Sequence, residues 1–347
     1  MRLQWFVTLT CILVNSCAFA CDLPVFRYAL EYWSADIYEV TIVHRGQLKA
    51  QEQNLLKKFK EASKQSNILI QTVDIARQPR HEVVKIWKGH SKPKLPWIVV
   101  QYPRLLRIRE PVWTSYFSAD AIELLLHSPT RSEIAKRLLN GDSAVWVLVE
   151  SGIKERDEAA VQLLQRQLKR MEKSLEFPED YRRYVFDIMG IDLRVTFPIV
   201  RVNRKSPKEQ VLVQTLLRIL GSDGQAKQPI AFPIFGRGRS LCALVGKELN
   251  EENVKEVCAF LTANCSCEVK AANPGWDILI SADWNDIASE QMAEFTPPPV
   301  SVPMPARSES RVSKIAKRTL LLVVLLQVVI VAVTACVVAW RRRKRRL

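Results

Sequence analysis

The sequence predicts an α/β protein whose soluble body repeats one order of strands and helices twice, followed by a single C-terminal membrane-spanning helix. The chain of 347 residues is long enough for two domains of the usual size. Its composition is 48% hydrophobic and 25% charged, with 11 glycines and 18 prolines. These values exclude a mainly disordered, collagenous or small disulfide-framework protein.

The net charge of +15 is concentrated near the C-terminus. Residues 307–347 contain eleven Lys or Arg residues against one Glu, so they supply most of the excess. The remaining chain is close to neutral for its size. We therefore interpret the basicity as a signal for membrane topology and expect no nucleic-acid partner.

The N-terminal segment, residues 1–20, has the features of a cleaved signal peptide. It carries Arg2, an apolar stretch, and then Ala18-Phe19-Ala20, the small-x-small pattern of a signal peptidase site. Cleavage after Ala20 makes Cys21 the first mature residue. The alternative is a lipobox with Cys21 as the lipidated terminus, although Ala18 stands where lipoboxes usually carry Leu.

The C-terminal segment predicts one membrane crossing. Residues 319–340 are almost wholly apolar and span about 33 Å as a helix. The basic tail, residues 341–347, keeps the C-terminus cytoplasmic. A stalk rich in Pro and Ser, residues 294–318, joins the span to the body. The predicted location is the cell membrane, with the body extracytoplasmic.

The first round of the pattern, residues 21–141, contains an N-terminal arm and the first domain. β-branched and apolar runs predict strands, and periodic apolar residues predict helices. We expect Ser118 to cap the last helix of this round. The predicted order is strand 38–43, helix 47–65, strand 67–75, helix 81–88, strand 95–100, strand 112–117 and helix 118–127.

The second round, residues 142–293, repeats this order. Trp146 and Phe232 are expected on core strands. Gly236-Arg237-Gly238-Arg239 lacks the third glycine of a dinucleotide-binding loop and precedes a strand, so it predicts a hairpin turn. The alternative is that its two arginines bind an anionic partner. The order is strand 144–149, helix 157–175, strand 197–202, helix 207–220, strand 229–235, strand 240–245 and helix 250–263.

This order resembles two tandem thioredoxin-like domains, and the resemblance is strongest over residues 229–263. It implies that Pro96 and Pro229 occupy the family's cis-proline position; the alternative for each is an ordinary trans proline at a strand edge. Thioredoxins act through Cys-x-x-Cys at the start of the first helix. The corresponding residues here, 44–47 and 150–153, contain no cysteine. The resemblance therefore implies redox-inactive domains, like the non-catalytic domains of disulfide isomerases.

The remaining candidate chemistry is a group of cysteines at the end of the second domain. In an oxidising compartment we expect Cys265 or Cys267 to bond Cys258 or Cys242 as a structural disulfide. Zinc or cuprous copper bound by these four thiolates is one alternative, despite their irregular spacing. Thiol exchange by Cys265 and Cys267 is the other.

Residues 21–33 resemble the opening of a membrane-anchored, extracytoplasmic bacterial family of unassigned function. We expect this arm to pack along the first domain; the alternatives are a partner-docking arm or a lipid anchor. The leading hypothesis is a non-enzymatic binding or scaffold protein without cofactor, whose partner is a protein of the membrane or envelope. The competing hypothesis is a thiol-exchange or metal-handling protein that uses Cys242, Cys258, Cys265 and Cys267.

Overall fold

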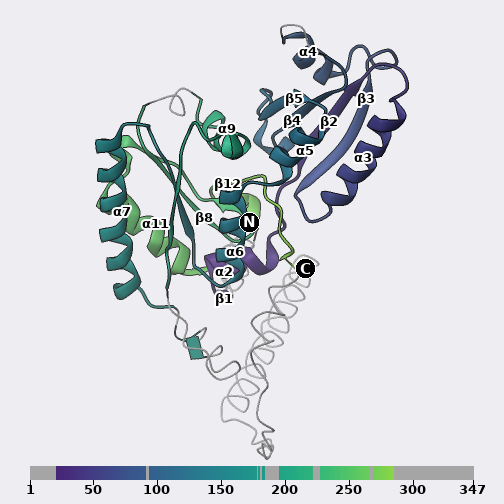
Figure 1. Cartoon of the computed structure of the whole chain (residues 1–347). Coiled ribbons are helices and arrows are strands. Elements are labelled where there is room, and N and C mark those ends of the chain that lie inside the picture. The colour runs from purple at the N-terminus through teal and green to yellow at the C-terminus, as the bar shows by residue number, and fades with distance from the viewer. Residues whose placement is uncertain are drawn as a thin grey trace, which may run out of the picture. The chain divides into compact units, whose positions relative to one another are not determined.

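The computed structural model describes residues 21–90, 94–177, 195–221, 227–265 and 269–284, together with residues 179, 182 and 183 (Figure 1). The predicted α/β class is confirmed. All of these residues belong to one compact unit that ends at Phe295. The predicted signal peptide, the stalk, the membrane span and the basic tail lie outside the described residues. Within the described part of the chain, no helix has the length and apolarity needed to cross a membrane.

The first sheet has the strand order β3-β2-β4-β5. β2 runs parallel to β3, whereas the β2–β4 and β4–β5 pairs are antiparallel. Three helices follow the strands along the chain: α3 after β2, α4 after β3 and α5 after β5. The bounds are β2 Tyr38–His44, α3 Ala50–Ala62, β3 Ile68–Asp74, α4 Glu82–Lys88, β4 Trp97–Gln101, β5 Trp113–Tyr116 and α5 Ala119–Leu126.

The burial of these strands follows from their composition. β2 is central and nearly all of its residues are buried, as its β-branched run Val40–Val43 requires. β3 is an edge strand, and only Val73 is fully buried in it. Ser118 caps α5 as expected, because its hydroxyl accepts a hydrogen bond of 3.2 Å from the Ala121 amide.

The second sheet has the order β12-β9-β8-β6-β7, with β10 also paired to β8. β6 is parallel to β7 and antiparallel to β8, and β9 and β10 are both antiparallel to β8. This repeats the pairing of the first sheet. The bounds are β6 Val145–Val149, α7 Lys154–Ser174, β7 Ile199–Val202, α9 Gln210–Arg218, β8 Ile230–Phe235, β9 Arg239–Ser240, β10 Leu244–Val245, α11 Glu251–Thr262 and β12 Trp276–Asp277.

Both faces of the second sheet are covered. Along β6, Trp146 and Leu148 enter the hydrophobic cluster formed with α7 and α11, which lie side by side in Figure 1. The alternate residues Val145, Val147 and Val149 enter a second cluster. That cluster receives apolar side chains from α9 and from α6 (Pro129–Leu139), the helix that joins the two sheets. Trp146 and Phe232 are 0% exposed, so the prediction that both lie on core strands is confirmed.

The N-terminal arm packs on the second sheet, and the expectation that it follows the first domain is wrong. The arm consists of β1 (Cys21–Pro24) and α2 (Val25–Tyr32). The apolar stripe of α2 joins the cluster that contains Trp146 and α11. β1 pairs antiparallel with β11 (Asn264–Cys265), directly after α11. The arm therefore covers the second sheet beside its last helix.

The segment after α11 connects the two sheets. Ile278 and Ile280 enter the hydrophobic cluster of the second sheet, whereas Leu279 between them enters that of the first sheet. This alternation is expected of an extended chain with a buried face on each side. The Tyr102 hydroxyl adds a further link by donating to the Thr215 carbonyl at 2.9 Å. The remaining short helical turns are Arg104–Leu106, Pro207–Glu209, Gly246–Glu248 and Lys270–Ala272.

Candidate functional site

The turn after β2 occupies the first position where the thioredoxin resemblance would require thiols. Its backbone is held by the Asp74 carboxylate, which accepts from the Gly46 amide at 3.0 Å and from the Ala76 amide at 2.9 Å. These backbone hydrogen bonds lower the pKa of Asp74. His44 Nδ1 donates to the Gly46 carbonyl at 2.8 Å. The Asp74 carboxylate and the His44 ring therefore both bind the backbone of Gly46.

The turn after β6 is closed in the same way. The buried carboxylate of Asp157, in the first turn of α7, accepts from the Ser151 amide at 2.7 Å and the Ser151 hydroxyl at 2.8 Å. It also accepts from the Gly152 amide at 3.0 Å. A helix N-terminus attracts negative charge. Here the Asp157 carboxylate binds the amides of Ser151 and Gly152 just before the helix.

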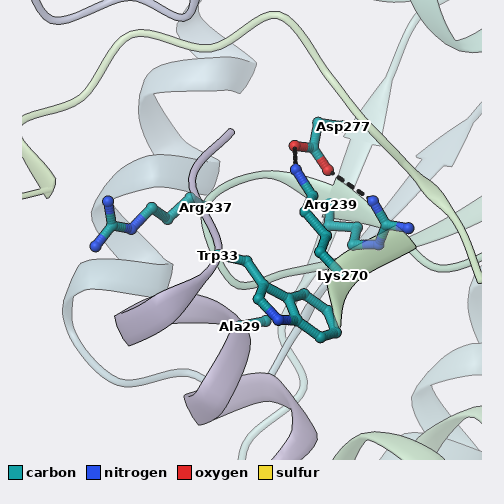
Figure 2. Close-up of a pocket in the computed structure, with 6 residues that line it drawn as sticks. All are labelled: Ala29, Trp33, Arg237, Arg239, Lys270 and Asp277. Atoms are coloured by element: carbon teal, nitrogen blue, oxygen red, sulfur yellow. Dashed lines mark hydrogen bonds and ion pairs between the residues drawn. The ribbon is translucent and has the colours of Figure 1, made fainter. Parts of the chain in front are cut away.

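A surface depression with charged side chains lies where the arm meets the segment after α11. We call this depression the clasp. Figure 2 shows the residues that line it: Ala29, Trp33, Arg237, Arg239, Lys270 and Asp277. Ala29 and Trp33 come from α2 and the residue after it. Arg237 comes from the turn between β8 and β9, and Arg239 is the first residue of β9. Lys270 and Asp277 come from the segment after α11.

Asp277 is the centre of the clasp. Its carboxylate accepts from Arg239 at 3.1 Å and from the backbone amide of Asp36 at 2.6 Å, and it also accepts from Lys270 (Figure 2). Its side chain is only 3% exposed. Lys270 additionally donates to the Ser34 carbonyl at 2.7 Å and to the Asp36 carboxylate at 2.8 Å. The two cations are thus matched by the carboxylates of Asp36 and Asp277, as burial of charge requires.

The Gly-Arg-Gly-Arg turn is confirmed as a hairpin, and its arginines bind the chain itself. Arg237 donates to the last carbonyls of α2, at 2.8 Å to Leu30 and 3.0 Å to Glu31. Arg239 donates to the carbonyls of Asn273 and Pro274 at 2.8 and 3.0 Å, and its guanidinium lies 5.8 Å from the Trp33 ring centroid. The hypothesis of an anion-binding turn loses its support, because these donors are engaged.

The glycines of this turn allow the close packing. Gly236 has φ +57°, and a Cβ there would lie 2.8 Å from Cβ of Ala29. Gly238 has φ +92°, and a Cβ there would lie 3.1 Å from the Ile280 side chain. Gly236 therefore leaves room for the arm to pack against this turn, and Gly238 leaves room for the segment after α11. Both also adopt the left-handed backbone region that favours glycine.

The clasp is too small to hold a typical organic ligand. Its depression has about 160 Å³ of empty space, and even this value includes open solvent. Ligand pockets usually measure about 300–1,000 Å³. With its charges paired and its volume this low, the clasp is a structural junction that fixes the arm to the body.

No protein-family model, curated protein or solved structure matches the chain.

The three described cysteines of the group, Cys242, Cys258 and Cys265, lie in or against one hydrophobic cluster of the second sheet. Cys242 and Cys258 carry free thiols, so neither forms the predicted bond with Cys265 or Cys267. Cys258 lies on the core side of α11 and packs as an apolar residue; burial raises the pKa of its thiol. Burial, with a smaller contribution from Glu248, raises the pKa of Cys242 to about 11. Cys267 lies outside the described residues.

The metal hypothesis has no support from the described residues. Within those ranges, no three His, Cys, Asp or Glu side chains come together as metal ligands. Cys242, Cys258 and Cys265 therefore do not form a three-thiol site. Protonated, buried thiols are also poor ligands and poor nucleophiles, because both roles require the thiolate.

The two candidate cis-prolines differ. The Leu95–Pro96 peptide bond is cis and lies at the entry to β4. It is the only cis bond of the described residues, so the expectation of a cis bond before Pro229 is wrong. A trans bond is the cheaper form for any X–Pro pair. The trans chain enters β8 directly, and the Pro229 carbonyl accepts from the Gly246 amide at 3.3 Å.

Two buried polar networks were not predicted. One is the clasp around Asp277. The other is at the start of α6, where Glu209 accepts from the Thr130 amide at 2.9 Å and from the Ser128 hydroxyl. Beside it, the buried Arg131 donates to the carbonyls of Leu125 at 2.8 Å and Leu279 at 3.2 Å. Ser128-Pro129 is a recognisable signal for the start of a helix. No local sequence motif marks Glu209 as the partner of this helix start, and none marks Asp277 as the centre of the clasp.

Proposed function

We propose that this chain is a single-pass, membrane-anchored extracytoplasmic binding or scaffold protein. Its two domains are thioredoxin-like and redox-inactive, and its partner is a protein of the membrane or envelope. The proposal assigns it no catalytic activity and no cofactor. Its body acts as a rigid recognition module held near the membrane by the stalk and the predicted span.

The thioredoxin-like assignment is supported by the strand pairing of both sheets. In each sheet, the first strand is parallel to the second and antiparallel to the third, and the fourth is antiparallel to the third. In each, a helix follows the first strand, a second helix follows the second strand, and a third helix follows the antiparallel strands, α5 after β5 and α11 after β10. This is the order of elements that the family uses.

The observation that carries the functional proposal is the closure of both strand-to-helix turns. Asp74 and Asp157 bind the backbone amides there. A dithiol enzyme keeps this place for a thiolate stabilised by the helix N-terminus. In this chain the strands and helices keep that order, but a carboxylate binds the amides at each of these turns. This favours a protein that binds a partner over one that exchanges thiols.

A protein partner is supported by the outer edge of β3. No described strand pairs with this edge. Its seven residues carry one charge, Asp74, and Leu69 is 54% exposed. Natural proteins usually protect such edges with charge or proline. An edge without that protection suits a partner that adds an extended segment as a further strand.

Site-specific photo-crosslinking in cells tests this proposal. A photoreactive residue at position 69 is expected to give one discrete protein adduct. The same residue at Leu105, which is 77% exposed but lies on a short helical turn, is the matched control and is expected to give none. Equal adduct formation at both positions, or none at position 69, contradicts the proposed edge.

Two further measurements test the remaining parts of the proposal. A reporter fused to the C-terminus is expected to be cytoplasmic while the body is accessible to protease from the other side. The purified full chain is expected to show no disulfide reductase activity and no stoichiometric zinc or copper. Bound metal, or turnover of a disulfide substrate, would favour the competing thiol or metal function instead.

A further inference from the structure

Cys21 lies opposite Cys265 in the antiparallel pair of β1 and β11, and the register of this pair shifts between Cys21 and Pro24. The pairing continues into the arm, because the Val25 amide donates to the Ala263 carbonyl at 3.0 Å. The first residue of β1 and the last residue of β11 therefore face each other across two short strands, although 243 residues separate them along the chain.

This register suits a covalent link. Residues directly opposite in an antiparallel pair have Cα atoms about 4.5–5.5 Å apart, and their side chains share one face of the pair. Disulfides require Cα atoms about 4.4–6.8 Å apart. We propose that Cys21 and Cys265 form an intrachain disulfide that fastens the N-terminal arm to the second sheet.

The other cysteines are less suited to this partnership. Cys258 lies on α11 with its thiol among the apolar residues of the core, and Cys242 follows β9. Neither is paired in register with the arm. Cys265 is 1% exposed and belongs to the same hydrophobic cluster as Val25 and Phe26 of the arm. The site is thus formed only when the arm is seated.

The chemistry needs an oxidant, which we take to be a small disulfide such as oxidised glutathione. One cysteine thiolate attacks a sulfur of the oxidant, forming a mixed disulfide and releasing one glutathione thiolate. The second cysteine then displaces the other glutathione. The two protein thiols lose two electrons and two protons, and the oxidant becomes two molecules of reduced glutathione.

This pairing also decides between two fates of Cys21. A sulfur bonded to Cys265 is not available for a thioether-linked lipid. The proposal therefore excludes the lipobox interpretation of the N-terminal segment and requires that Cys21 be retained with an unmodified side chain.

Peptide mapping without reduction tests the proposal on the full chain, extracted from membranes in detergent after blocking free thiols with N-ethylmaleimide. We expect a linked peptide pair containing Cys21 and Cys265, formed directly or after incubation with oxidised glutathione. Cys265→Ser is expected to abolish the pair and leave Cys21 alkylated. Cys267→Ser is the matched control and is expected to leave the pair intact.

Four outcomes would overturn the proposal: Cys21 alkylated in the wild type after the glutathione incubation, Cys21 carrying a lipid mass, Cys21 linked to Cys267, or Cys265 linked to Cys258. Reduction kinetics supply a second readout. Because Cys265 is buried, dithiothreitol is expected to reduce the native bond at least about ten times more slowly than the bond in urea-unfolded protein. Equal rates would contradict the buried pair.

Discussion

The hydroxyl of Tyr38, on the central strand of the first sheet, donates a hydrogen bond of 2.7 Å to the carbonyl of Asp277, on the last strand of the second sheet. Tyr38 is fully buried, and burial raises the pKa of its phenol well above 10.0. The phenol therefore stays protonated and acts as a donor across the neutral pH range. This contact joins the clasp to the core of the other sheet.

Replacing Tyr38 by Phe is expected to lower the free energy of unfolding by about 1–2 kcal/mol, because the buried carbonyl of Asp277 loses its donor. Urea denaturation measures the change. Tyr116→Phe is the control, since Tyr116 is 43% exposed, and is expected to change stability by less than about 0.5 kcal/mol. Equal effects of both substitutions would show that the cross-sheet hydrogen bond contributes nothing.

Replacing Asp277 by Asn leaves the buried Arg239 guanidinium facing a neutral side chain, whereas Lys270 keeps its contact with the Asp36 carboxylate. Breaking a buried ion pair by removing one partner typically costs about 3–5 kcal/mol. We expect a loss of this size in urea denaturation, together with faster proteolysis of the arm. Glu61→Gln removes a carboxylate that is 72% exposed and pairs with Lys64, so it is expected to be nearly neutral. A stable Asp277→Asn variant with a protected arm would contradict the role of the clasp.

Replacing Gly236 by Ala tests whether α2 of the arm packs against the turn between β8 and β9. The new Cβ would be strained at φ +57° and would meet Ala29 at 2.8 Å, so we expect a loss of about 2–4 kcal/mol. Gly46→Ala is the matched control, because Gly46 has φ +66° and no atom within 4 Å of the added Cβ. It is expected to cost only about 1 kcal/mol. Similar losses for the two variants would mean that α2 does not press on this turn.

The free thiols predict a dependence on alkaline pH. Burial raises the pKa of Cys242 from its ordinary value of 9.0 to about 11. The stability that this thiol contributes is complete below pH 9 and is lost as the pH rises toward about 11, because only the unfolded chain releases the proton. Cys242→Ala is expected to flatten the stability curve in this interval, as measured by urea denaturation at each pH.

The same shift predicts slow alkylation. At pH 8 the thiolate fraction of Cys242 falls about 100-fold relative to an unperturbed cysteine. Iodoacetamide labelling followed by mass spectrometry is expected to show this ratio between unfolded and native protein, with Cys258 slower still because it is more deeply buried. Comparable labelling rates in the native and unfolded chains would contradict the shift.

Most strands and helices of the two sheets could be predicted because each is marked by its own residues, although α2, α6, β11 and β12 were not among them. Val145–Val149 is wholly apolar, as a strand covered on both faces must be, and the structure covers it on both. The position of the arm could not be predicted in the same way. The stripe of α2 shows that one face is buried, but an apolar stripe carries no information about which sheet it packs against.

The candidate site was harder to predict for a related reason. The contact between Asp36 and Asp277 joins residues 241 positions apart, and neither residue belongs to a local motif. The cysteine group was a visible pattern, but its members lie on different elements that the spacing alone could not orient. What the sequence showed correctly was the absence of thiols at residues 44–47 and 150–153.

The meeting of the arm with the segment after α11 has a consequence for biosynthesis. A chain made from its N-terminus exposes Val25, Phe26 and Trp33 long before their binding surface is complete. At roughly 5–20 residues per second, the 241 positions between Asp36 and Asp277 take about 12–48 s to synthesise. During that interval the arm is an unprotected apolar segment, and we expect it to be the principal binding site for chaperones that accompany the nascent chain.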